Sequence, residues 1–124
     1  MNILVIEHDL KFSGFLRDAL KTWNLEADFY KQGKGAIKKD GLKKYNLVIL
    51  DISRDDFEGE KMVAKVKETY PDSGIIILTD HNSRDLEIRI RKHGILYYMI
   101  KPIEIKELKN LIDYIERKNI KKNQ

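Results

Sequence analysis

The sequence predicts an α/β fold, a doubly wound five-stranded parallel sheet, from three features of its apolar residues. Short apolar runs alternate five times with segments of helical period along the 124 residues. The central runs are continuous, which is typical of parallel strands covered on both faces. Polar residues stand where these runs stop, and in open α/β sheets ligands bind beyond the carboxyl ends of the strands.

The first two strands differ in character. Residues 3–6 are an unbroken Ile-Leu-Val-Ile run, which predicts a buried strand. The helix after it has apolar residues at spacings of three and four, with Asp9 as the expected N-cap. Residues 27–30 are more polar and predict an edge strand, followed by a short lysine-rich helix from Gly35 to Leu42.

The middle of the chain predicts two more buried strands, at residues 47–50 and 75–78. Gly59 is expected to precede the helix between them, which carries one apolar stripe and stops near Pro71. The next helix is expected to start at an N-cap, Ser83, and its apolar residues form no single stripe.

The last pair of elements is a strand at residues 96–100 and a helix with a continuous apolar face. Gly94 is the expected stop before this strand. The apolar positions of the final helix recur at helical spacing; they are Ile105, Leu108, Leu111, Ile112 and Ile115.

Composition restricts the class of protein. Hydrophobic residues make up 42% of the chain and charged residues 35%, which suits one globular domain. No apolar stretch approaches the roughly 20 residues that cross a bilayer, so we expect a cytoplasmic protein with no membrane partner. The absence of cysteine excludes disulfides and thiolate catalysis. The net charge of +4 is concentrated near the C-terminus and by itself implies no nucleic-acid partner.

Four motifs occur in a fixed order along the chain. They are Ile-Leu-Val-Ile before Glu7, Leu-Val-Ile-Leu-Asp51-Ile, Ile-Ile-Leu-Thr79, and Tyr98-x-x-Lys101-Pro102. With this order the chain resembles a response-regulator receiver domain over residues 1–119, and residues 120–124 are expected to form a basic C-terminal tail. The resemblance implies a flavodoxin-like three-layer sandwich with the strand order 2-1-3-4-5.

The resemblance also implies a function in two-component signal transduction. Asp51 matches the family's phosphoacceptor, which takes a phosphoryl group from a histidine kinase, a phosphotransfer protein or a small phosphodonor. Lys101 and Thr79 match the amine and the hydroxyl that contact the phosphoryl oxygens, and Tyr98 matches the aromatic switch residue. Such a protein is a phosphoacceptor with at most self-catalysed phosphotransfer and dephosphorylation, so we do not expect an enzyme.

The implied cofactor is Mg²⁺, and here the chain departs from the family pattern. The resemblance assigns the metal to Glu7, Asp51 and the backbone carbonyl of Ser53, but His8 stands where the family has a second acid. Imidazole is a poor ligand for Mg²⁺, which prefers hard oxygen atoms. Asp80 is a second departure, since the family prefers a small residue after Thr79.

Three interpretations of His8 remain open. The imidazole fills space and hydrogen-bonds a neighbouring carboxylate in a site that has drifted. A protonated imidazole between Glu7 and Asp51 substitutes for the missing cation. Alternatively, the site takes a metal that accepts imidazole, such as manganese or zinc, with His8, Glu7 and Asp51 as ligands.

Two functions therefore remain. The first is a receiver that is phosphorylated on Asp51 and changes its affinity for an effector protein or output domain. The second is a phosphorylation-independent pseudo-receiver that acts as a protein-interaction module. A flavin carrier of the same fold is disfavoured, because the residues after the first strand are acidic.

Family partners bind the face made by the fourth helix, the fifth strand and the fifth helix. Homodimers of the family also form there, so the resemblance implies a possible homodimer. In this chain the face is expected to include Arg84, Arg89, Arg91, Tyr97 and Tyr98.

Overall fold

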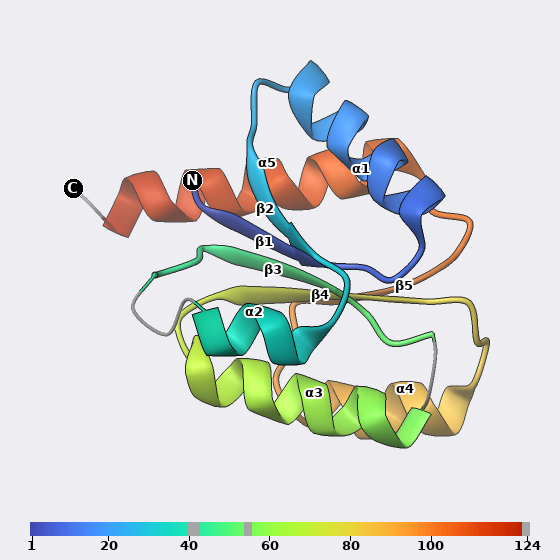
Figure 1. The fold of residues 1–124 in the computed structure, drawn as a ribbon. Helices are drawn as coiled ribbons and strands as arrows, with labels where there is room; N and C mark the ends of the chain where they lie inside the picture. The colour runs from blue at the N-terminus through green and yellow to red at the C-terminus, as the bar shows by residue number, and fades with distance from the viewer. Residues whose placement is uncertain (40–42, 54–55, 123–124) are drawn as a thin grey trace.

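A computed structural model of the chain describes residues 1–39, 43–53 and 56–122. Five parallel strands form one sheet in the order β2-β1-β3-β4-β5, with helices on both faces (Figure 1). This arrangement confirms the predicted fold class and the strand order that the resemblance implied. None of the described helices is both long enough and apolar enough to span a membrane.

The strands and helices alternate along the chain. The strands are β1 (Ile3–Ile6), β2 (Ala27–Tyr30), β3 (Leu47–Asp51), β4 (Gly74–Thr79) and β5 (Tyr97–Ile100). The helices are α1 (Leu10–Thr22), α2 (Gly33–Lys39), α3 (Asp56–Thr69), α4 (Arg84–Arg91) and α5 (Ile105–Lys122).

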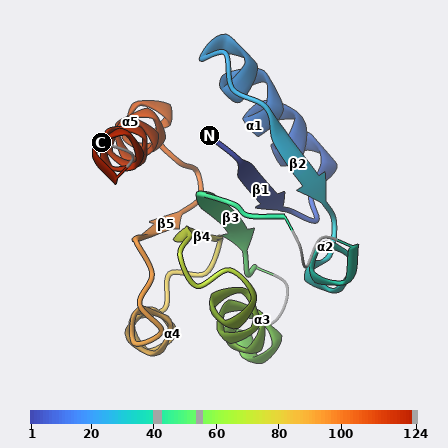
Figure 2. The ribbon, with the colours of Figure 1, turned by 90° about the vertical axis from the view of Figure 1, so that its left-hand side faces the viewer.

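The sheet separates two apolar clusters. Helices α1 and α5 cover one face, and α2, α3 and α4 cover the other, as seen along the sheet in Figure 2. Successive residues of a strand face opposite sides, so Leu4 and Ile6 contribute to one cluster while Ile3 and Val5 contribute to the other. Each buried aliphatic side chain of this kind contributes about 1.5–3 kcal/mol to folding.

Burial explains why the strands differ in composition. All residues of β1 are buried, and so are the first four residues of β3. All four residues of β2 are only half-buried, because β2 has a neighbouring strand on one side alone. The polar character of β2 therefore predicted its edge position correctly.

Side-chain caps begin two of the helices where the sequence predicted them. The Asp9 carboxylate accepts hydrogen bonds from the backbone amides of Lys11 and Phe12, at 2.9 and 3.3 Å. The Ser83 hydroxyl accepts one from the amide of Leu86, at 3.2 Å. Such caps satisfy amide groups that have no partner within the helix.

Two predicted helix starts differ from the structure. Helix α3 begins at Asp56, so Gly59 lies in its first turn and does not precede it. An added Cβ there would lie 2.7 Å from Cβ of Ile52, so the close approach of helix and loop requires glycine. Helix α2 begins two residues before the predicted Gly35, and the predicted end at Leu42 falls outside the described residues.

The C-terminal boundary stays a prediction. Helix α5 continues to Lys122, so the first residues of the expected tail, 120–122, are helical. The last residues of that tail, 123–124, fall outside the described residues.

Candidate functional site

The predicted polar residues stand at one edge of the sheet because four neighbouring strands end there. Asp51 is the last residue of β3, and Thr79 is the last residue of β4. Glu7 follows β1, and its amide donates to the carbonyl of Tyr30 at 2.9 Å. Lys101 follows β5, and its amide donates to the carbonyl of Thr79 at 2.8 Å. The backbone therefore fixes the position of each of these residues.

Two groups of Ser53 hold one oxygen of Asp51. Asp51 Oδ1 accepts hydrogen bonds from the Ser53 amide at 2.8 Å and from the Ser53 hydroxyl at 2.5 Å. The same hydroxyl accepts a bond from the Asp80 amide at 3.0 Å, which links the loops after β3 and β4. The resemblance assigned only the backbone carbonyl of Ser53 to the site, so these two contacts were missed.

Lys101 bridges the two carboxylates of the pocket. Its Nζ lies 2.9 Å from Asp51 Oδ2 and 2.6 Å from Glu7 Oε1. The same ammonium lies 4.1 Å from the ring centroid of Phe12, within the range of a cation–π contact. Both carboxylate side chains are almost completely buried, so one ammonium group is shared by two acids in a poorly solvated place.

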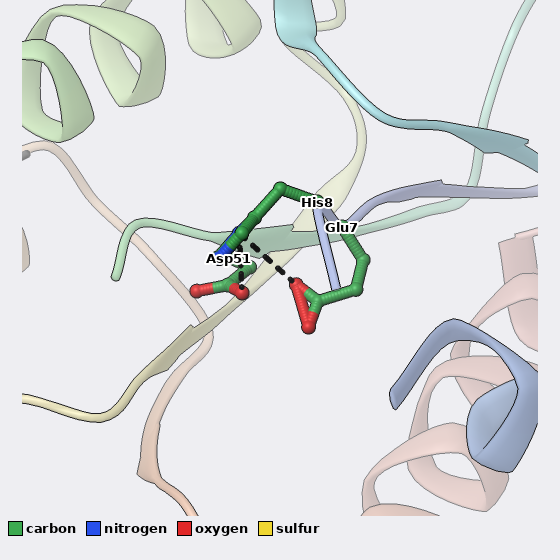
Figure 3. A group of neighbouring side chains, drawn as sticks. All are labelled: Glu7, His8 and Asp51. Atoms are coloured by element: carbon green, nitrogen blue, oxygen red, sulfur yellow. Dashed lines mark ion pairs between the residues drawn. The ribbon is translucent and has the colours of Figure 1, made fainter. Parts of the chain in front are cut away.

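His8 lies over the Asp51 carboxylate. Its Nδ1 is 3.2 Å from Asp51 Oδ2 and 4.0 Å from Glu7 Oε2, and the three side chains point toward one another (Figure 3). The His8 side chain is 31% exposed, whereas that of Asp51 has no exposed surface. The imidazole therefore stands between solvent and the predicted phosphoacceptor.

This environment changes the pKa values of Glu7, Asp51 and Lys101. Burial raises the pKa of Glu7 to about 8, and contact with Asp51 adds to the rise while Lys101 opposes it. Burial works against ionisation of Asp51 as well, but hydrogen bonds from Glu7, Ser53 and Lys101 lower its pKa overall. Burial also works against the charge of Lys101, yet the two carboxylates raise its pKa. Asp51 is thus the ionised acid at neutral pH, and Glu7 takes up a proton first.

Thr79 is completely buried and is joined to the site through the loop that follows it. Its Oγ1 accepts a hydrogen bond from the amide of His81 at 3.0 Å. The ring of His81 in turn donates from Nε2 to the backbone carbonyl of Ser53 at 2.7 Å. His81 thus contacts the very carbonyl that the resemblance assigned to the metal, and no pattern in the sequence pointed to it.

Tyr98 lies on the side of the sheet covered by α4. It is 6% exposed and belongs to the same apolar cluster as Leu86 and Ile90 of α4. Its position next to Ile77 in the register of β4 and β5 places it two residues before Thr79 on the neighbouring strand. A movement of Tyr98 would therefore change the packing of α4.

Comparison with protein families decides which family these features belong to. A family model described as the response regulator receiver domain matches residues 3–113. The chain belongs to this family. The receiver domain matches the transcriptional regulatory protein ZraR of Klebsiella oxytoca, with 28% identity over 87% of this chain and 24% of that protein. It also matches the regulatory protein LuxO of Vibrio cholerae, with 27% identity over 92% of this chain and 25% of that protein.

The chain therefore spans about a quarter of the length of these curated relatives. Among solved structures, a two-component response regulator from Clostridium difficile has a TM-score of 0.85 and 25% identity, covering 94% of this chain and 96% of that one. The beryllofluoride-activated NtrC4 receiver domain dimer has a TM-score of 0.82 and 24% identity, covering 92% of this chain and 94% of that one. These neighbours share the fold that brings the strand ends of the receiver domain together.

The residues present fit a divalent cation. Ligand atoms of Glu7, His8 and Asp51 all lie within 4.8 Å of one another. Glu7 Oε2 is buried, and no hydrogen-bond donor among the described residues reaches it. A buried carboxylate oxygen of this kind is costly unless a cation or a proton satisfies it. Glu7 and Asp51 are therefore the residues that would hold Mg²⁺, the metal that receiver domains generally bind.

Proposed function

We propose that this receiver domain accepts a phosphoryl group on Asp51 and thereby changes its affinity for a partner. The observation that carries this proposal is the position of Asp51. It is an ionised carboxylate at a strand end, hydrogen-bonded to Lys101 at 2.9 Å and oriented by Ser53 at 2.8 Å. A carboxylate can act as a nucleophile on phosphorus when nearby positive charge compensates for the charge on the phosphoryl oxygens.

In the proposed step an oxygen of Asp51 forms a bond to phosphorus as the bond between phosphorus and the donor breaks. With a phosphohistidine donor, the electron pair of the broken bond returns to the imidazole nitrogen of the donor. The Lys101 ammonium, which already contacts Asp51 Oδ2, compensates for negative charge on the oxygens of the incoming phosphoryl group. Bound Mg²⁺ would supply further compensation for the charge on the phosphoryl oxygens.

Hydrogen bonds connect Asp51, which would carry the phosphoryl charge, to the loop after β4. The Thr79 hydroxyl bonds the amide of His81, and the Asp80 amide bonds the hydroxyl of Ser53, which itself contacts Asp51. The proposed response is a rearrangement of the loop after β4, followed by Tyr98 and α4. Thr79 and Tyr98 act in this proposal as the residues that couple phosphorylation to the partner surface.

The proposed partners are a histidine kinase or phosphotransfer protein and an effector protein or output domain. Each of α4, β5 and α5 carries an exposed large hydrophobic side chain: Ile88 at 46%, Ile100 at 36% and Tyr114 at 39% exposure. Arg89 of the same face forms a solvent-exposed ion pair with Glu60 of α3, at 3.1 Å. A homodimer through this face is part of the proposal, since exposed apolar residues beside Tyr97 suit an interface.

The position of the His8 side chain between Asp51 and solvent favours a second candidate function. A pseudo-receiver would keep the fold and the partner face but not accept a phosphoryl group. In the structure the Asp51 side chain has no exposed surface, and His8 Nδ1 lies 3.2 Å from its Oδ2. Phosphorylation therefore requires a movement that exposes an oxygen of Asp51 beside His8, whereas binding of a partner by a pseudo-receiver requires no such movement.

A phosphorylation assay separates the two functions. The chain is incubated with acetyl phosphate or phosphoramidate, with Mg²⁺, with Mn²⁺ or with a chelator, and the adduct is located by mass spectrometry. We expect one phosphoryl group on Asp51, which disappears in D51N and persists in D72N, a change of an exposed turn residue. Absence of an Asp51 adduct with every donor and metal would overturn the proposed phosphotransfer and favour the pseudo-receiver.

A further inference from the structure

The pocket of Asp51 offers a nitrogen atom as well as oxygen atoms to a cation. His8 Nδ1 lies 3.2 Å from Asp51 Oδ2 and 4.0 Å from Glu7 Oε2, and ligand atoms of all three residues lie within 4.8 Å of one another (Figure 3). Two ligands of one first-row metal ion are separated by about 3–4.5 Å, since each lies roughly 2.0–2.2 Å from the ion. The three side chains thus have the spacing of a metal site before any rearrangement.

Glu7 gives an independent indication that this pocket takes a cation. The residue is 2% exposed, and its two oxygens have different surroundings. Oε1 accepts from Lys101 at 2.6 Å, whereas Oε2 is buried and has no donor among the described residues. Oε2 is also the oxygen nearer to His8, so the atom that a proton or a cation must satisfy belongs to the three-residue cluster.

We propose that Glu7, His8 and Asp51 bind a divalent first-row transition-metal ion such as Mn²⁺, Co²⁺ or Zn²⁺, and that the imidazole of His8 makes this ion preferred over Mg²⁺. The inference rests on the proposed function because it concerns the same pocket, and it specifies which metal the phosphoacceptor works with. The ligands are two carboxylates and His8 Nδ1, which is the ring nitrogen that faces Asp51.

The chemistry of the ligands decides the preference. Mg²⁺ requires oxygen ligands in near-octahedral geometry and keeps several waters, so an imidazole adds little to its binding. Imidazole is a good ligand for zinc and other first-row ions, and affinity for such sites rises from Mn²⁺ to Co²⁺ and beyond. An oxygen-only site discriminates less between Mg²⁺ and these ions than a site with one nitrogen ligand does.

The charge of the pocket is compatible with such an ion. Two carboxylates and the Lys101 ammonium give a formal charge of −2 + 1 = −1 when Glu7 is ionised. A divalent ion changes this to +1, which suits an incoming phosphoryl group. Lys101 contacts Oε1 of Glu7, whereas Oε2 is the oxygen nearer to His8, so the two oxygens of Glu7 can serve the ammonium and the ion separately.

Metal titrations of the full chain test the preference. Dissociation constants for Mg²⁺, Mn²⁺, Co²⁺ and Zn²⁺ are measured by calorimetry for the wild type and for H8D, which has the oxygen ligand found in the family. We expect the ratio of the Mg²⁺ to the Co²⁺ dissociation constant to fall by about tenfold or more in H8D. The control is H93A. His93 follows α4 and pairs with Glu60 of α3 at 3.2 Å, so it lies outside the cluster of Glu7, His8 and Asp51.

Spectroscopy of the wild type gives a second readout that needs no variant. In ¹⁵N spectra of the histidine side chains, Zn²⁺ should shift the Nδ1 resonance of His8, and Co²⁺ should broaden it. An unchanged metal ratio in H8D overturns the proposal, as does a His8 resonance that is unaffected by bound metal. A chain that binds Co²⁺ through His8 but forms no Asp51 adduct would contradict the proposed phosphotransfer and leave the metal preference standing.

Discussion

Replacement of Glu7 by glutamine (E7Q) changes the pH dependence of stability, because Glu7 is a buried acid that resists ionisation. Its pKa rises from an ordinary value of 4.5 to about 8 in the folded chain. The folded state therefore binds a proton more tightly than the unfolded state does. The stability that this proton provides is complete below 4.5 and is lost as the pH rises through about 8.

Glutamine has the shape of the protonated acid and cannot ionise. Between about pH 5 and about pH 8 the free energy of unfolding of the wild type should fall by about 3 kcal/mol relative to that of E7Q. The amide oxygen can still accept the hydrogen bond of Lys101 that Glu7 Oε1 now accepts at 2.6 Å. E7Q is thus expected to be the more stable protein at pH 8 and the weaker metal binder.

Urea denaturation of both proteins at several pH values measures this difference, with metal removed by a chelator. The matched control is E68Q, which changes an exposed acid on α3 and should keep a constant difference from the wild type. If the difference between E7Q and the wild type is also constant from pH 5 to pH 8, the buried acid ionises as freely as an exposed one. Our description of the pocket would then be wrong.

Other substitutions test further parts of the structure. K101M removes the ammonium that contacts Asp51 Oδ2 at 2.9 Å, and we expect the rate of Asp51 phosphorylation to fall by about 100-fold. An unchanged rate in the mass-spectrometric assay would contradict this role. G59A places a Cβ 2.7 Å from that of Ile52 and should destabilise the chain by about 1–3 kcal/mol in urea denaturation. G33A meets only the flexible side chain of Met62, so it should cost less than G59A, and equal losses would refute this reasoning.

The fold was predictable because its strands are short, apolar and buried on both faces. The continuous runs in β1, β3 and β4 follow from their central places in the sheet, and the polar β2 follows from its edge position. The predicted start of α3 was wrong because Gly59 was assigned to the loop before the helix. In the structure Gly59 is needed inside the helix, where α3 packs closely against Ile52.

The sequence predicted those residues of the site whose positions are determined by the ends of the strands. Glu7, Asp51 and Lys101 meet because parallel strands place their carboxyl ends at one edge. The two bonds from Ser53 to Asp51 had a local signal, since an aspartate often accepts from the amide two residues later. The contact of His81 with Ser53 had none, because it joins two loops whose approach depends on the whole sheet.

The central claim is that Asp51 accepts a phosphoryl group with the help of Lys101 and of an ion bound by Glu7 and His8. A crystal structure with beryllofluoride and Mn²⁺ tests this claim most directly. We predict beryllofluoride attached to an oxygen of Asp51, with the ion bound by Glu7 and His8 and the Lys101 ammonium in contact with the adduct. A pocket without the adduct, in which His8 still covers Asp51 at saturating beryllofluoride, would contradict this claim.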